Sequence, residues 1–128
     1  MKYLLEVKVD FAAAHIVRGH LGKCARLHGH NWKVHVVVKS EILNDLGMGI
    51  DFADLKKIVH EVIDPLDHQY LNEIEPFTVI NPTAEQVARF IYEEIEKKLS
   101  TNNLGSSLIV MQEVSLFETD NCKVTFFK

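Results

Sequence analysis

The sequence predicts an α+β domain in which a four-stranded antiparallel sheet carries two helices on one of its faces. Near both termini, apolar residues alternate with polar ones as in strands, and between these regions apolar residues recur at helical spacing. The chain has 128 residues, of which 47% are hydrophobic, and this suffices for one hydrophobic core. Residues 1–128 are therefore expected to form a single domain.

The first two predicted strands lie on either side of a loop that contains two glycines. Residues 3–15 place mainly apolar side chains at odd positions, and residues 28–39 place them mainly at even positions. Each pattern predicts a strand with one buried face. Residues 16–27 show no such period and carry three basic residues, which is typical of a loop near a functional site.

Two helices are predicted next. Asp51 is placed to cap the first, which should end by Pro65. Thr83 is placed to cap the second, with Gln86 at its third helical position. Residues 102–105, with the sequence Asn-Asn-Leu-Gly, are expected to end this helix. Its apolar stripe consists of Val87, Ala88, Ile91, Ile95 and Leu99.

The chain closes with two further predicted strands, residues 108–117 and 123–127, joined by a turn at residues 119–121. The outer strands of a four-stranded sheet leave backbone groups unpaired. Because such edges pair readily with another chain, we expect the protein to associate with copies of itself.

The composition argues against several classes of partner. The formal net charge of −4 is spread along the sequence, so no basic stripe suggests nucleic acid binding. No apolar run is long enough to cross a bilayer, and Glu6, Lys8 and Asp10 interrupt the apolar residues at the start before they could form a signal peptide. We therefore expect a cytoplasmic protein with no membrane partner, in which Cys24 and Cys122 are free thiols.

Three histidines are expected to meet at one end of the sheet. His28 and His30 are two residues apart in one strand and point to the same side, while His15 ends the buried face of the neighbouring strand. Three neutral imidazoles with a free fourth position are typical of a catalytic zinc ion, Zn²⁺. A single histidine would be read as an ordinary half-buried residue, but three together favour a metal site.

Cys24 allows two interpretations. It lies four residues before His28 and could complete a closed structural zinc site of one cysteine and three histidines. It could equally stay off the metal as a thiolate base, with Lys23, Arg26 and the cation lowering its pKa. The residues alone leave both interpretations open.

Two further acidic positions are candidates for chemistry. Asp67 and His68 form an acid–histidine pair that could transfer protons, although such pairs are also common on surfaces. Glu118 stands at the end of an apolar-faced strand, where its carboxylate could be solvated or could bind a donor-rich, guanidine-like ring edge. No chemical role is predicted for Cys122, His20, His35 and His60.

Six motifs span nearly the whole chain in the order FAAAH, CARLHGHNW, IDFADLK, LDHQYLN, NPTAE and FETD. Through them the sequence resembles the family of 6-pyruvoyltetrahydropterin and 6-carboxytetrahydropterin synthases. The resemblance implies the tunnelling fold, in which subunits join their sheets into a barrel. It also implies a homo-hexamer made of two trimers, with active sites between subunits.

The resemblance assigns roles to the matching residues, in three groups. The implied zinc ligands are His15, His28 and His30. The implied catalytic residues are Cys24 as proton acceptor, Asp67 and His68 as a relay that could serve a neighbouring subunit, and Glu118. The implied substrate-binding residues are Glu118, which would anchor the pterin, and Thr83 and Glu85, which would lie beside the pterin pocket.

Family members share the substrate 7,8-dihydroneopterin triphosphate, and the basic residues Arg18, Lys23 and Arg26 are candidates to meet its phosphates. Three residues between Cys24 and His28 resemble the 6-carboxytetrahydropterin synthases of queuosine biosynthesis, which release triphosphate and acetaldehyde. This zinc-dependent lyase activity is the predicted function.

Two alternatives to this function remain. The segment FETDN is more like the branch that makes 6-pyruvoyltetrahydropterin, and a non-catalytic zinc-stabilised oligomer is an alternative of another class. A third branch, which makes a hydroxymethyl pterin, carries glutamate at or beside the cysteine and is disfavoured because Ala25 follows Cys24.

Overall fold

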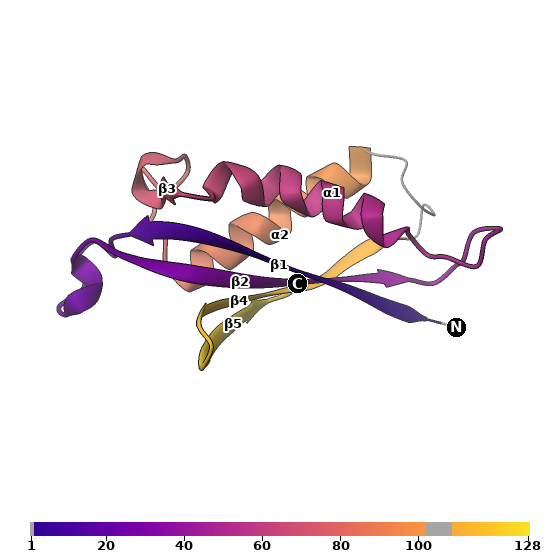
Figure 1. The fold of residues 1–128 in the computed structure, drawn as a ribbon, viewed down its shortest axis with the longest axis horizontal. Helices are drawn as coiled ribbons and strands as arrows, with labels where there is room; N and C mark the ends of the chain where they lie inside the picture. The colour runs from indigo at the N-terminus through magenta and orange to yellow at the C-terminus, as the bar shows by residue number, and fades with distance from the viewer. Residues whose placement is uncertain (1, 102–108) are drawn as a thin grey trace.

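The computed structural model describes residues 2–101 and 109–128. Its sheet has the strand order β3-β1-β2-β4-β5, and both long helices lie on one side of it (Figure 1). The strands are β1 (Tyr3–His15), β2 (His28–Ser40), β3 (Gln69–Tyr70), β4 (Val110–Thr119) and β5 (Cys122–Phe126). The helices are α1 (Phe52–Ile63) and α2 (Ala84–Thr101), with short 3-10 turns η1 (Lys23–Ala25), η2 (Asp64–Leu66) and η3 (Leu71–Glu73).

The predicted class, an α+β fold with two helices, is confirmed, but the predicted four-stranded antiparallel sheet is wrong. The sheet has five strands and is mixed, because the two-residue strand β3 pairs in parallel with β1 at Ala13 and Ala14. Two residues are too few to show an alternating pattern, so sequence periodicity carried no signal for this strand. Its effect is to bring the segment after α1 against the end of β1.

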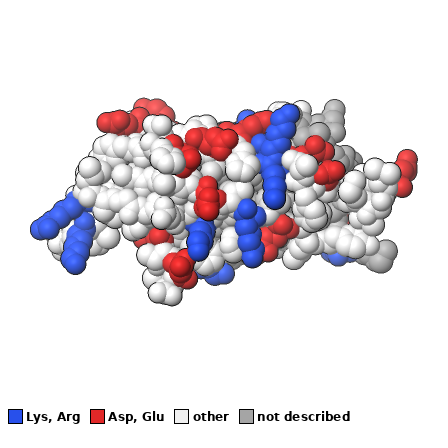
Figure 2. All heavy atoms as spheres, viewed as in Figure 1, with Lys and Arg blue, Asp and Glu red and all other residues white. Residues whose placement is uncertain are grey.

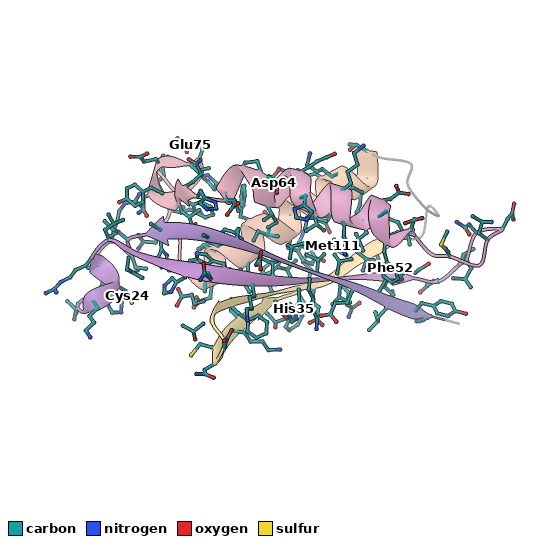
Figure 3. All side chains as sticks on the ribbon, in the orientation of Figure 1. Cys24, His35, Phe52, Asp64, Glu75 and Met111 are labelled. Atoms are coloured by element: carbon teal, nitrogen blue, oxygen red, sulfur yellow. The ribbon has the colours of Figure 1, made fainter. Side chains whose placement is uncertain are left out.

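Strands β1 and β2 pair antiparallel along their whole length, from Tyr3 opposite Ser40 to His15 opposite His28. The inward face of β2 is fully buried at Val34, Val36 and Val38, as the alternation predicted. Met111 points between the sheet and the helices, whereas His35 lies on the face turned away from them (Figure 3). One face of the sheet therefore forms the core with the helices.

The closing hairpin is shifted from its predicted position. Strand β4 continues to Thr119, which pairs with Cys122 and leaves a two-residue turn. The predicted turn at residues 119–121 was therefore one residue too long, since Thr119 belongs to the strand. The predicted helix end at residues 102–105 and the predicted strand start at residue 108 lie outside the described residues.

Both helix starts follow their predicted caps. The Asp51 carboxylate accepts a 2.7 Å hydrogen bond from the Ala53 N–H, and the Thr83 hydroxyl accepts one of 3.2 Å from the Gln86 N–H. These bonds satisfy backbone donors that have no partner within a helix. Helix α1 ends at Ile63, before Pro65, as predicted.

The face shown in Figure 2 carries acidic and basic side chains side by side, with basic ones on the loop that projects at its left end. This loop joins β1 to β2 (Figure 1). Within residues 2–101 and 109–128, no helix combines the length and apolar character needed to cross a membrane.

Gly49 is expected to be essential for packing at the end of the sheet far from the histidines. A Cβ atom at this position would lie 2.6 Å from Ser40 Oγ and 2.7 Å from Ser40 Cβ. Ser40 is fully buried and its hydroxyl donates to the Ile42 carbonyl, so it cannot move aside freely. Gly49→Ala should therefore lower the free energy of unfolding by about 1–3 kcal/mol, measured by denaturant titration.

The matched control is Gly29→Ala, whose new Cβ would meet no atom closer than Ala13 O at 3.7 Å. Equal stability of the two variants would contradict the packing argument.

Candidate active site

His15, His28 and His30 come together at one end of the sheet. His15 is the last residue of β1 and stands opposite His28, the first residue of β2, while His30 stands opposite Ala13. One ring nitrogen from each histidine lies within 4.8 Å of those of the other two. No other group of at least three metal-binding side chains occurs within the part of the chain that the structure describes. The convergence predicted from the strand pattern is thus present.

The ring nitrogens are arranged as metal ligands require. His15 Nδ1 lies 2.7 Å from the Pro82 carbonyl and His28 Nδ1 lies 2.6 Å from the Arg26 carbonyl. Because a carbonyl only accepts, each Nδ1 carries the proton, which leaves the lone pair on Nε2. Nε2 of His15 and of His30 is buried without any hydrogen-bond partner. Buried polar atoms are rarely left unpaired, so these two nitrogens fit a bound metal ion.

The protonation state also suits a metal. Burial lowers the pKa of His15, and the neighbouring His28 lowers it further, against the opposite effects of the Pro82 carbonyl and Glu118. Burial likewise lowers the pKa of His30. Both rings are therefore neutral at pH 7, the form that donates to zinc. The rings of His15 and His30 also pack edge-on against buried Trp32, at centroid distances of 5.0 and 5.2 Å.

Glu118 reaches the same site from β4. Its Oε1 lies 3.7 Å from His15 Nε2, and its side chain is 34% exposed, in contrast to the fully buried His15. The carboxylate therefore lies between the histidines and solvent. It is free of any hydrogen bond or second ion pair with the other described residues, so it remains available to a ligand.

Asp67 and His68 lie beside the histidines on the other edge of β1. The Asp67 carboxylate accepts a 2.9 Å hydrogen bond from the Ala12 N–H and lies 3.0 Å from His68 Nδ1. The Ala12 bond is the main cause that holds the pKa of Asp67 below its usual value, with His68 adding to it. His68 is highly exposed and lines one open groove together with His30. His68 therefore borders the same groove as His30.

Cys24 lies in η1, on the loop that projects beyond the sheet (Figure 3). It is half-buried, its thiol is free, and it is not part of the three-histidine group. Its backbone carbonyl accepts a 2.7 Å hydrogen bond from the Val17 N–H, which ties the loop to the chain just after His15. The arrangement matches an open three-histidine site better than a closed site with a cysteine ligand.

The remaining predicted residues have mixed surroundings. Thr83 caps α2 and follows Pro82, the acceptor of the His15 bond, whereas Glu85 is exposed in the first turn of α2. The guanidinium of Arg18 donates to the carbonyls of Phe77 (2.7 Å) and Ile80 (3.4 Å), so this side chain is engaged by the protein itself.

Three contacts at the site were not anticipated from the sequence. Pro82 orients His15 through its carbonyl, and the side-chain amides of Asn72 and Asn81 bond the backbone of Ile16 and Arg18. The two asparagines stand in the motifs LDHQYLN and NPTAE, which gave the only available signal.

Comparisons with known proteins point to one family. A putative 6-carboxy-5,6,7,8-tetrahydropterin synthase of Archaeoglobus fulgidus is 39% identical over 74% of this chain and 77% of its own length. The dihydroneopterin monophosphate aldolase of Pyrococcus furiosus is 40% identical over 77% of this chain and 80% of its own. The structure of 6-pyruvoyl tetrahydropterin synthase from Caenorhabditis elegans superposes with a TM-score of 0.86 at 28% identity, covering 100% of this chain and 96% of that one.

The family model of 6-pyruvoyl tetrahydropterin synthase matches residues 4–128, which include every residue of the site just described. With nearly the whole chain matched and relatives close to 40% identical, the chain belongs to the 6-pyruvoyl tetrahydropterin synthase family.

Proposed function

We propose that this protein is a zinc-dependent lyase that converts 7,8-dihydroneopterin triphosphate into 6-carboxy-5,6,7,8-tetrahydropterin, triphosphate and acetaldehyde, for queuosine biosynthesis. The observation that carries the proposal is the convergence of three histidines, two of which, His15 and His30, have a buried Nε2 atom without a hydrogen-bond partner. His15, His28 and His30 would hold the ion, which would polarise substrate oxygens when bound. We further propose that the active form is a cytoplasmic homo-hexamer.

The protein's own groups would divide the remaining tasks. Glu118, whose carboxylate lies 3.7 Å from His15 Nε2, would accept hydrogen bonds from the donor edge of the pterin ring. The Cys24 thiolate would remove a proton from a side-chain carbon of the substrate. His68, held by Asp67 and open to the groove, would pass protons to and from the substrate side chain. Thr83 and Glu85 would border the pterin.

The relatives described above bear three different activity names at 28–40% identity, so we assign the product from motifs in this chain's own sequence. The carboxy product is favoured by the three-residue spacing between Cys24 and His28. The pyruvoyl product is the second candidate, favoured by the segment FETDN at residues 117–121.

Product analysis tests the assignment directly. Zinc-loaded protein is incubated with 7,8-dihydroneopterin triphosphate without a reductase, and pterins and aldehydes are identified by mass spectrometry. We expect 6-carboxytetrahydropterin together with acetaldehyde. Formation of 6-pyruvoyltetrahydropterin would show that the second candidate function is correct. Absence of any product from zinc-loaded protein would favour a non-catalytic zinc-stabilised oligomer.

His28→Ala should remove the metal site. It deletes one of three ligands, and because loss of an outer-shell partner alone weakens metal binding by roughly 10–100-fold, loss of a ligand should cost about 100-fold or more. Zinc affinity is measured by competition with a chelator, alongside turnover. His60→Ala is the matched control, since His60 is exposed on α1 and its ring bonds only Asp64 among the described residues. Parent-like zinc affinity in His28→Ala would rule out the assigned ligand set.

Cys24→Ala should separate the two interpretations of this cysteine. As a base, Cys24 is needed for proton transfer only, so the variant should keep stoichiometric zinc while kcat falls by about 10²–10⁴-fold. The control is Cys122→Ala, which removes the other, exposed thiol and should leave both quantities unchanged. Loss of zinc from Cys24→Ala would instead identify Cys24 as a metal ligand.

A further inference from the structure

The edge of β1 that faces β3 is paired near the end of the strand, at Ala12 and Ala14, by both backbone and side-chain groups. At Ala12, the N–H donates to the Asp67 carboxylate and the carbonyl accepts 2.6 Å from the His68 N–H. At Ala14, the partner is Tyr70 in β3. This edge pairing brings residues 67–70 against the last residues of β1 before His15.

The same pairing continues after β1 has ended, with asparagine side chains in place of a strand. The Ile16 N–H donates to Asn72 Oδ1 at 2.8 Å, and Asn72 Nδ2 donates to the Ile16 carbonyl at 2.9 Å. The Arg18 N–H and carbonyl bond Oδ1 and Nδ2 of Asn81 in the same way, both at 2.9 Å. Each amide thus reproduces the two bonds that a neighbouring strand would make.

We call the paired hydrogen bonds made by each asparagine side chain an amide clamp. The two clamps lie next to the proposed zinc ligand His15 and the proposed base Cys24. His15 immediately precedes Ile16, and its Nδ1 bonds Pro82, the residue after Asn81. Val17 stands between the clamped residues, and its N–H donates to the Cys24 carbonyl. The backbone that Asn72 and Asn81 fix is therefore the backbone that sets His15 and Cys24 relative to each other.

The clamps require amides and not carboxylates. An aspartate at either position could still accept from the backbone N–H, but it has no proton to donate to the carbonyl 2.9 Å away. An oxygen of the aspartate carboxylate would then face the oxygen of the backbone carbonyl. Asn72 is buried, at 8% exposure, so solvent cannot relieve this repulsion easily, whereas the Asn81 bonds are exposed.

We propose that Asn72 and Asn81 are positioning residues, which fix the backbone from His15 to Arg18 so that the zinc ligand His15 and the base Cys24 keep their places. The inference rests on the proposed function. Asn72, nearest to His15, acts mainly on metal binding, and Asn81, beyond Val17, acts mainly on the loop that carries Cys24.

The test compares Asn72→Asp and Asn81→Asp with Asn44→Asp. Asn44 Oδ1 accepts from the N–H groups of Leu46 and Met48, and no hydrogen bond involves its Nδ2 within the described residues, so the control makes the same chemical change without losing a bond. Gly49→Ala serves as a second control, because it destabilises the opposite end of the sheet. For every variant we measure zinc affinity by chelator competition, the visible spectrum of the cobalt-substituted protein, and kcat and KM with zinc saturating.

Asn72→Asp should weaken zinc binding about tenfold or more and alter the cobalt spectrum, because it would displace the backbone next to His15 and so misorient this ligand. Asn81→Asp should bind zinc within about threefold of the parent, yet lose at least about tenfold in kcat with KM nearly unchanged, because a small displacement of a catalytic group is costly. Both controls should match the parent in zinc affinity and in the cobalt spectrum.

Parent-like zinc affinity and spectrum in Asn72→Asp, together with parent-like kcat in Asn81→Asp, would overturn the inference. If Asn72→Asp does not fold, the kcat of Asn81→Asp decides whether the inference holds. This variant should fold, because the bonds it changes are exposed. If the parent binds zinc but makes no pterin product, the proposed reaction is wrong. The zinc affinity and cobalt spectrum of Asn72→Asp then still test whether Asn72 positions His15. If Gly49→Ala weakens zinc as much as Asn72→Asp, general destabilisation explains the effect and the inference is wrong.

Discussion

The antiparallel pairing that sets His15 opposite His28 is the constraint on which the rest of the site depends. A shift of one residue in this register would turn the histidines to the opposite face of the sheet. The long apolar faces of β1 and β2 prevent that shift, because it would also expose the buried valines at positions 34, 36 and 38. The burial that fixes the core therefore also fixes the positions of the three histidines at the end of the sheet.

A buried metal site needs more than three converging rings. Burial lowers the pKa of His15 and of His30, and the carbonyls of Pro82 and Arg26 select the tautomer of His15 and His28 that leaves Nε2 free. These carbonyls come from the segment before α2 and from the projecting loop, neither of which belongs to the central strands. The sheet thus supplies the position of the ligands, and the connections supply their orientation.

The parts that could be predicted from the sequence are those with a local signal. Alternation gave β1 and β2, caps gave the starts of both helices, and the spacing of His28 and His30 gave the ligand cluster. Strand β3 was not predicted, because two residues are too few to show a periodic pattern. The contact between His15 and Pro82 was not predicted either, because every residue has a backbone carbonyl. Such contacts join positions 67 residues apart in the chain, and only the folded topology brings them together.

Relatives with three different activity names match this chain over most of its length, so membership of the family does not by itself determine the product. A zinc ion held by three imidazoles supplies polarisation that suits elimination and carbon–carbon cleavage alike. Which bond breaks depends on where the base and the proton relay stand relative to the substrate side chain. In the proposed function those groups would be Cys24 on the projecting loop and His68 beside the edge of β1, both outside the regular sheet. Loops tolerate sequence change more readily than a packed core, so we expect these two positions, rather than the sheet, to decide which product this protein makes.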